Sequence, residues 1–221
     1  MILIGLGAKA RQGKNFVCNY WLEAVPELKV YAFADALKEY CRDHHDELVA
    51  QYYRVHQLSM AVHPISEVIG QPKDDPIYGY TKVLQWFGTW KRSEDPNYWV
   101  DIVAAKLNEG QPDIAAITDV RFLNEAQFIK DNGGYVVEVI RRNEDGSRYL
   151  DPNRDPKHIS ETALDDYTFD YSIIARSGDL ESLKSKALGV LSNIISTELA
   201  KAEEPTDIDV LTDFDAFPGI T

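Results

Sequence analysis

The chain has 221 residues, 44% of them hydrophobic and 27% charged, with a formal net charge of −13. This length suits one α/β domain with room for a lid and a tail. The acidity argues against general nucleic-acid binding, because phosphate contacts need dense Lys and Arg, but it allows a local positive pocket for a small anion. No segment approaches the roughly 18 apolar residues of a membrane span. Cys18 and Cys41 lack metal-site spacing, so we expect two buried thiols in a reducing cytoplasm.

Strands and helices are predicted to alternate along the chain, because short apolar runs indicate buried strands and apolar residues at helical spacing indicate amphipathic helices. In chain order we expect a strand at 2–6, a helix at 15–24, a strand at 28–33, a helix at 36–55, a loop at 64–80, helices at 81–90 and 96–110, a strand at 113–118, a helix at 121–131, a strand at 135–140, a polar loop at 141–158, a strand at 169–175 and a helix at 180–199. This order predicts an α/β fold with a doubly wound, parallel, five-stranded sheet flanked by helices.

One domain is expected over residues 1–200, with a mobile lid at about 141–160, followed by a tail at 201–221. From Glu198 to the last residue there are seven acidic residues and one lysine, without a helical apolar stripe. We therefore expect the tail to be disordered. Apolar residues such as Val210 and Phe214 alternate with the acidic ones, which leaves open that the tail docks a protein partner.

The turn after the first strand carries the strongest functional signal. It reads Ala8, Lys9, Ala10, Arg11, Gln12, Gly13, Lys14 and Asn15, between an apolar strand and a helix. That context is typical of a phosphate-binding P-loop. Gly13 lets the backbone approach a phosphate, Lys14 reaches the β and γ oxygens, and the helix N-terminus favours the anion. Ala8 stands where glycine is usual, and Asn15 stands where Ser or Thr usually binds Mg²⁺, so nucleotide binding without catalysis stays open.

Further blocks carry a resemblance to a known family. In order they are GAKARQGKN, AFADALKEY, LQWFGTWKR followed by YWV, ITDVRFLNEA, VVEVIRRN and HISE. In this order and spacing the chain resembles the bacteriophage-type deoxynucleoside monophosphate kinases, a branch of the P-loop nucleotide kinases. The resemblance implies transfer of the ATP γ-phosphate to a deoxynucleoside 5′-monophosphate in the presence of Mg²⁺. It also implies a lid, a helical region that binds the monophosphate and, for a phage-encoded protein, the cytoplasm of an infected host cell.

Asp119 and Arg121 lie just past the third predicted strand, at the sheet edge where open α/β folds bind ligands. Oxygen ligands suit Mg²⁺, so Asn15 and Asp119 are the candidate metal ligands, and the planar fork of Arg121 suits an acceptor phosphate. Two alternatives stay open, namely that Asp119 caps the next helix and that Arg121 is solvated. Glu125 is expected on a helix face beside a Lys. Because phosphoryl transfer needs positioned positive charge, the expected catalytic residues are Lys14, Arg92, Asp119 and Arg121.

Residues that follow the second predicted strand, or that lie on later predicted helices, are candidates for binding the acceptor nucleotide. They are Asp35, Lys38, Gln85, Thr89, Arg92, Trp99 and Arg121. Gln85 and Thr89 share one helix face at i and i+4 and could read a base edge. Asp35 could instead be only a helix N-cap. Trp99 is favoured for stacking on a base by its family block, although core packing is the commoner fate of such aromatic residues.

Arg141 and Arg142 begin the polar loop after the fourth predicted strand. The resemblance implies that residues at this place clamp ATP phosphates or stack on adenine. A lid that closes excludes the water that would hydrolyse ATP. We therefore expect entry into the site, on closure, of at least one of Arg148, Arg154 and Lys157.

Other functions are compatible with parts of the sequence. A kinase could act on a modified base or nucleotide in phage DNA metabolism, although a polymer substrate needs a basic groove, which the acidity disfavours. A dephospho-coenzyme A kinase is argued against by the AFADALK and DVRFLNEA blocks. A non-catalytic nucleotide-binding regulator is the third alternative. We expect small nucleotides as partners, and we leave a homodimer open.

Overall fold

A five-stranded parallel sheet forms the centre of the molecule. The computed structural model describes residues 1–56, 80–152 and 154–203. Within them, the strands have the spatial order β2-β3-β1-β4-β5. Their bounds are Ile2–Gly7 for β1, Lys29–Tyr31 for β2, Ile114–Val120 for β3, Tyr135–Arg142 for β4 and Tyr171–Arg176 for β5. All the pairings are parallel, so every strand presents its carboxyl end to the same edge of the sheet.

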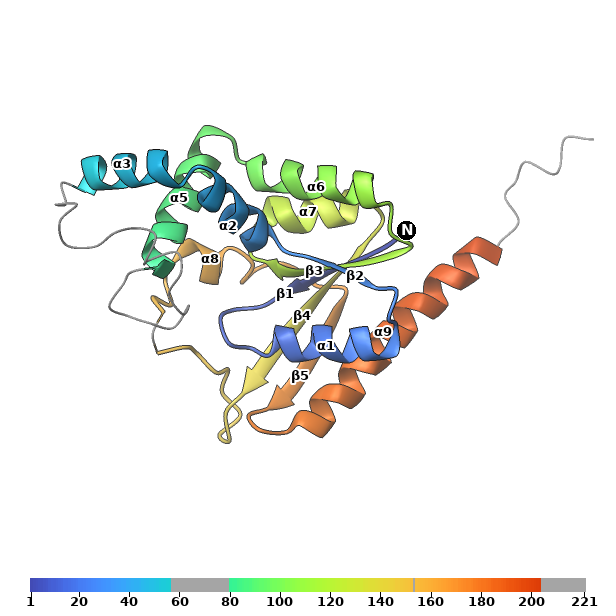
Figure 1. Cartoon of the computed structure of the whole chain (residues 1–221). Coiled ribbons are helices and arrows are strands. Elements are labelled where there is room, and N and C mark those ends of the chain that lie inside the picture. Colours follow the sequence, from blue (N-terminus) through green and yellow to red (C-terminus); the bar gives the residue numbers. More distant parts are fainter. Residues whose placement is uncertain (57–79, 153, 204–221) are drawn as a thin grey trace, which may run out of the picture.

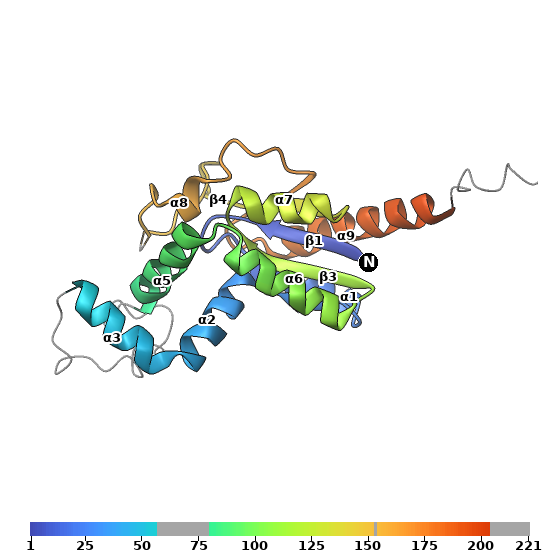
Figure 2. The ribbon, with the colours of Figure 1, turned by 90° about the horizontal axis from the view of Figure 1, so that it is seen from above.

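Helices cover both faces of this sheet (Figures 1 and 2). The helices are α1 (Lys14–Ala24), α2 (Phe33–Asp43), α3 (His45–His56), α5 (Tyr80–Glu94), α6 (Tyr98–Gly110), α7 (Leu123–Asp131), α8 (Ile159–Thr162) and α9 (Leu180–Glu203). One face is covered by α1 and α9, and the other by α2, α6 and α7. None of the helices in the described residues is both long and apolar enough to cross a membrane.

The core has two halves because side chains of a strand alternate between the two faces of the sheet. Leu3 of β1 packs in the half that contains α2, α6 and α7, whereas Ile4 and Leu6 pack against α1 and α9. Gly5 faces α7, where an added Cβ would clash with the side chain of Ile129. The glycine therefore lets α7 lie close to the central strand.

The predicted fold class is confirmed, and every predicted strand is present with shifted ends. The predicted helix 36–55 is wrong in one respect: the chain forms two helices, α2 and α3, which meet at His44. The predicted strand 28–33 is shorter, because Phe33 already begins α2. The predicted strand 135–140 extends through Arg142. Most of the predicted loop at 64–80 and nearly all of the acidic tail lie outside the described residues.

The start of α2 differs from its prediction because its N-terminal cap comes from another part of the chain. Asp35 was predicted to precede this helix, but it lies within the first turn and pairs with Lys38 at 2.7 Å. The first amides of α2 are instead held by the carboxylate of Asp119, which accepts from the backbone N–H groups of Phe33 (2.8 Å) and Ala34 (2.7 Å). A carboxylate at this end also complements the helix dipole.

Candidate active site

The predicted phosphate loop lies between β1 and α1, at the carboxyl edge of the central strand. Gly13 has a φ of 102° and Arg11 a φ of 55°. The first value is favourable only for glycine, which explains Gly13, and the second places an arginine in a sparsely occupied conformation. Lys14 begins α1, and its Nζ lies 3.3 Å from the carbonyl oxygen of Ala8 at the start of the loop. The strand–loop–helix arrangement that the sequence predicted is therefore present.

Arg121 lies beside this loop because β3 pairs directly with β1. Its Nη1 donates to Oε1 of Glu161 at 2.8 Å and to the carbonyl oxygen of Ser160 at 3.3 Å. Arg121 is therefore held by α8 rather than solvated. Asp119, two residues earlier, caps α2 and not the helix that follows β3.

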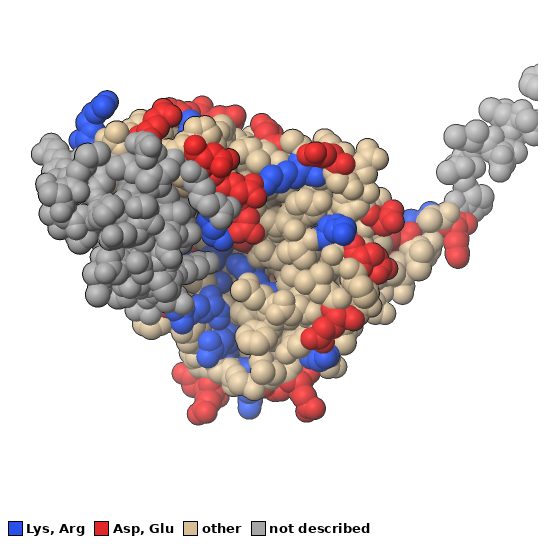
Figure 3. Space-filling model, viewed as in Figure 1, with Lys and Arg blue, Asp and Glu red and all other residues tan. Residues whose placement is uncertain are grey.

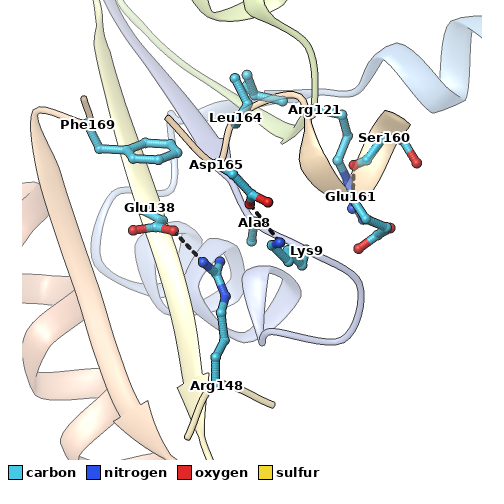
Figure 4. A pocket seen from close by; sticks show the side chains of 11 residues that line it. Ala8, Lys9, Arg121, Glu138, Arg148, Ser160, Glu161, Leu164, Asp165 and Phe169 are labelled. Atoms are coloured by element: carbon cyan, nitrogen blue, oxygen red, sulfur yellow. Dashed lines mark hydrogen bonds and ion pairs between the residues drawn. The ribbon is translucent and has the colours of Figure 1, made fainter. Parts of the chain in front are cut away.

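Glu161 is a residue of this site to which the sequence assigned no role. Its Oε2 accepts a hydrogen bond from the backbone N–H of Ala10 at 2.9 Å, while its Oε1 accepts from Arg121. The residue is only 7% exposed. One buried carboxylate thus joins the loop after β1 to the arginine after β3, and Figure 4 shows its contact with Arg121. The HISE block was the available signal, but its partners are about 40 and 150 positions away in the sequence.

Three more ion pairs lie around the loop; two connect it to the segment between β4 and β5, and the third joins that segment to β4. They are Lys9–Asp165 at 2.6 Å, Arg11–Asp151 at 3.1 Å and Arg148–Glu138 at 2.9 Å. The first and third line one small pocket together with Arg121 and Glu161 (Figure 4). Figure 3 shows Lys and Arg gathered in a hollow near the middle of one face, despite the acidic net charge. In the small pocket itself, each of the three cations is paired with a carboxylate.

Arg141 and Arg142 are the last residues of β4, rather than the first residues of a loop. The chain then turns back, and Tyr149 donates its N–H to the carbonyl oxygen of Arg141 at 2.8 Å. The guanidinium of Arg141 lies 4.1 Å from the centre of the Tyr149 ring. Nη1 of Arg142 donates to the carbonyl oxygen of Gly146 at 2.6 Å. Both arginines thus hold the hairpin that starts the predicted lid.

Gln12 fastens this hairpin to the phosphate loop. Its side chain is almost fully buried, with the residue 2% exposed. Its Oε1 accepts from the N–H of Arg141 at 2.7 Å, and its Nε2 donates to the carbonyl oxygen of Tyr149 at 2.6 Å. A glutamine can satisfy both groups because its amide carries an acceptor and a donor side by side. The predicted loop residue Gln12 therefore has a definite structural contact.

Five of the acceptor candidates lie on α2 and α5. Asp35 and Lys38 form their pair on α2, and Thr89 is exposed on α5. Arg92, near the end of α5, donates from Nη2 to Glu125 at 2.9 Å and lies over the Phe122 ring. The side chain of Gln85 lies outside the described residues.

Glu125 is buried and does not pair with a Lys as predicted. Its Oε2 accepts from the N–H groups of Arg121 (2.7 Å) and Phe122 (3.1 Å), and so caps α7, while Oε1 accepts from Arg92. Burial raises the pKa of Glu125 to about 7, and the guanidinium of Arg92 acts in the opposite direction. This carboxyl group links the strand end that carries Arg121 to the helix that carries Arg92.

Trp99 departs from its predicted place on the surface of the site. It is 1% exposed, packs edge-on against Tyr40, Phe87 and Tyr98, and its Nε1 lies 3.3 Å from the carbonyl oxygen of Gly88. The ring therefore belongs to the core and offers no face to a base. An open pocket elsewhere on α5 is lined by Trp86, Thr89, Trp90, Ser93 and His158.

The predicted metal ligands Asn15 and Asp119 both offer oxygen atoms. Asn15 is exposed in the first turn of α1, and each carboxylate oxygen of Asp119 accepts a backbone hydrogen bond from the start of α2. Such an oxygen retains a lone pair, and oxygen-only donors match a hard cation that also takes phosphate and water ligands. The donor chemistry therefore fits. Among the described residues, no group of three or more His, Cys, Asp or Glu side chains could hold a metal ion by itself.

The chain is similar in sequence to a viral protein. No family model matches the chain. A curated protein of Acanthamoeba polyphaga mimivirus, named "Putative deoxynucleotide monophosphate kinase", is 28% identical over 156 residues. The similarity covers 64% of this chain and 75% of the viral protein.

Proposed function

We propose that this chain is a nucleotide kinase that transfers the γ-phosphate of ATP to a deoxynucleoside 5′-monophosphate. The observation that carries the proposal is the meeting of the loop 8–15 and Arg121 at one sheet edge. The loop that begins α1 with Lys14 lies beside Arg121, and Glu161 touches both elements. The name of the mimivirus relative supports the kinase reaction and the class of acceptor.

On the ATP side, the loop 8–15 supplies backbone N–H groups to the β and γ phosphates, and Lys14 balances the charge that moves during transfer. Arg141 and Arg142 hold the hairpin over this region, so they act on ATP through the position of the lid as well as through charge. The ion pairs of Lys9 and Arg11 keep the following segment close to the loop. This closeness would exclude water from the phosphates.

A magnesium ion would be held by Asn15 and Asp119 together with phosphate oxygens and water. When bound, the ion neutralises charge on the transferring phosphoryl group. Asp119 also fixes the start of α2, so the same carboxylate would connect the metal to the helix that carries Asp35 and Lys38.

On the acceptor side, Arg121 and Arg92 would hold the phosphate of the monophosphate. Their positions are linked through Glu125, which accepts from the side chain of Arg92 and from the backbone of Arg121. Thr89 lies in the open pocket of α5, beside Trp86 and Trp90. We therefore assign recognition of the base to this pocket in place of Trp99, because an indole face can stack on a base while Thr89 meets its edge.

An ADP-release assay with ATP, Mg²⁺ and each of the four deoxynucleoside monophosphates tests the proposal, with a set of modified monophosphates run in parallel. We expect turnover with at least one canonical monophosphate. Turnover with modified monophosphates only would favour the role in modified-base metabolism. A thermal shift with ATP and Mg²⁺, without turnover on any acceptor, would favour a nucleotide-binding regulator and overturn the kinase assignment.

A further inference from the structure

Glu161 holds Arg121 by one nitrogen only. Both hydrogen bonds of the guanidinium to described residues leave from Nη1, one to Glu161 and one to the carbonyl oxygen of Ser160. Nε and Nη2 of Arg121 have no protein partner within the described part of the chain. Arginine binds a phosphate best through two parallel N–H groups. Because Nη1 is already bonded, Nε and Nη2 on the other edge of the guanidinium are available to bind two phosphate oxygens.

The other oxygen of Glu161 fixes the direction of this fork relative to the phosphate loop. Oε2 accepts from the N–H of Ala10, which belongs to the loop, so the carboxylate is held at both ends. The side chain of Glu161 is 6% exposed, whereas that of Arg121 is 20% exposed. A buried carboxylate that is bonded on both oxygens has little freedom to move. Arg121 is thus anchored from its buried side and open towards solvent.

The neighbouring pair of Glu125 and Arg92 shows a different arrangement. Glu125 accepts from the backbone N–H groups of Arg121 and Phe122, at the start of α7, the helix that contains Glu125 itself. Glu161 instead connects two segments that come from different strands, the loop after β1 and the end of β3. Loss of Glu125 would loosen a helix start, whereas loss of Glu161 would release the orientation of one arginine relative to the loop.

We propose that Glu161 is a positioning residue, which sets Arg121 at a fixed orientation to the phosphate loop so that its free edge receives the acceptor phosphate. This inference rests on the proposed kinase function. Phosphoryl transfer depends strongly on how accurately the donor and acceptor are aligned. A residue that touches both the loop and the acceptor arginine is well placed to maintain this alignment without touching a substrate.

The variant Glu161→Gln keeps the size of the side chain, removes its charge and places an N–H donor against one of the two existing donors. We expect the KM for the monophosphate to rise roughly tenfold, as for the loss of one charge-assisted hydrogen bond, with a smaller change in the KM for ATP. Glu23→Gln is the matched control, because Glu23 pairs with Lys184 at 2.9 Å on the surface between α1 and α9. The control should leave both KM values unchanged.

A double-mutant cycle separates positioning from a general structural role. If Glu161 acts through Arg121, then Glu161→Gln should add less than about a twofold change to the monophosphate KM when Arg121 is already alanine. Additive losses would overturn the inference, and so would a lower monophosphate KM in the single variant, because that would make Glu161 a competitor of the phosphate. Melting temperatures of all variants are measured to exclude unfolding.

Calorimetric titration of the same variants with a monophosphate distinguishes failure of this inference from failure of the kinase function. If the wild-type chain binds a monophosphate without turnover, the kinase assignment fails, and weaker binding by Glu161→Gln still supports the positioning role. If the wild-type chain turns over and Glu161→Gln behaves like Glu23→Gln, only the positioning role fails. If the wild-type chain neither binds nor turns over any monophosphate, both fail.

Discussion

The phosphate side and the aromatic side of the candidate site are held together by different interactions. On the phosphate side, comprising the loop 8–15, the end of β3 and the segment 138–165, three cationic side chains meet carboxylates that are distant in sequence. On the aromatic side, comprising α2, α5 and α6, the contacts are mainly between stacked and edge-on rings.

This difference indicates how each side responds to change. Ion pairs and buried hydrogen bonds depend on direction, so a substitution on the phosphate side should alter the alignment of groups more than the stability of the fold. Ring packing depends on buried area, so a substitution in the aromatic core should lower stability first. The predictions below test this contrast between alignment and stability.

Lys14→Ala should have the largest effect, because it removes the cation that would contact the β and γ phosphates. We expect ADP formation to fall below detection, while the melting temperature stays within a few degrees of the wild-type value, since Lys14 is only half-buried. Lys29→Ala is the control, because Lys29 is exposed on β2, and it should keep full turnover. Wild-type turnover by Lys14→Ala would refute the role of the loop.

Arg121→Ala should raise the KM for the monophosphate by roughly tenfold to a hundredfold and the KM for ATP by less, because a charge-assisted contact to one substrate is lost. Arg121→Lys keeps the charge without the fork, so it should recover only part of the loss. Steady-state kinetics with each substrate varied in turn measure both constants. Unchanged constants for both substrates in Arg121→Ala would show that the acceptor phosphate binds elsewhere.

Trp99→Ala should destabilise the fold by about 3–5 kcal/mol, as expected for removal of a buried aromatic side chain. Trp86 is only partly buried and lines the open pocket of α5. Trp86→Ala should therefore cost less stability but raise the KM for the monophosphate. Urea unfolding gives the stability and steady-state kinetics give the KM. The contrast between the two sides would be lost if Trp99→Ala weakened monophosphate binding without lowering stability.

The sequence predicted the fold well because its signals are local. The apolar strand before the loop, the glycine with a left-handed conformation and the helix after it are all encoded within residues 2–24. The start of α2 was misplaced because its cap, Asp119, comes from β3 and has no local signature.

The candidate site was predicted only in part, for the same physical reason. Lys14 and Arg121 could be named because each follows a strand in a recognisable block. Glu161 and the fastening role of Gln12 could not, since both depend on contacts between segments more than 100 positions apart. Trp99 was misjudged because the sequence pattern of a helical aromatic residue is the same whether its ring packs in the core or faces a binding site.

The pH dependence of stability should reveal the buried carboxyl that joins the two sides. Burial raises the pKa of Glu125 to about 7 in the folded chain, above the ordinary value of about 4.3. The folded state therefore binds this proton more tightly, so the stabilising contribution is complete below about pH 4 and is lost as the pH rises through 7.

Glu125→Gln should remove this loss, so the wild-type free energy of unfolding should fall relative to the variant by roughly 3 kcal/mol between pH 4 and pH 8. Urea unfolding of both proteins at several pH values measures the difference. Parallel pH profiles of wild type and Glu125→Gln would mean that the carboxyl is ionised throughout, held so by Arg92 and the N–H groups that begin α7.

Gln12→Ala should have a smaller effect on stability than Trp99→Ala and the most selective effect on the ATP side. It leaves the N–H of Arg141 and the carbonyl oxygen of Tyr149 without their bonds to the glutamine side chain, which should cost about 1–3 kcal/mol. Because these bonds fasten the hairpin to the loop, we expect the KM for ATP to rise while the KM for the monophosphate changes little. Gln127→Ala removes an exposed glutamine that bonds to Asp131 on α7, and should change neither constant. An equal rise of both KM values in Gln12→Ala would mean that the hairpin aligns the whole site rather than its ATP side, because a loosened hairpin would then also displace Arg121 through α8.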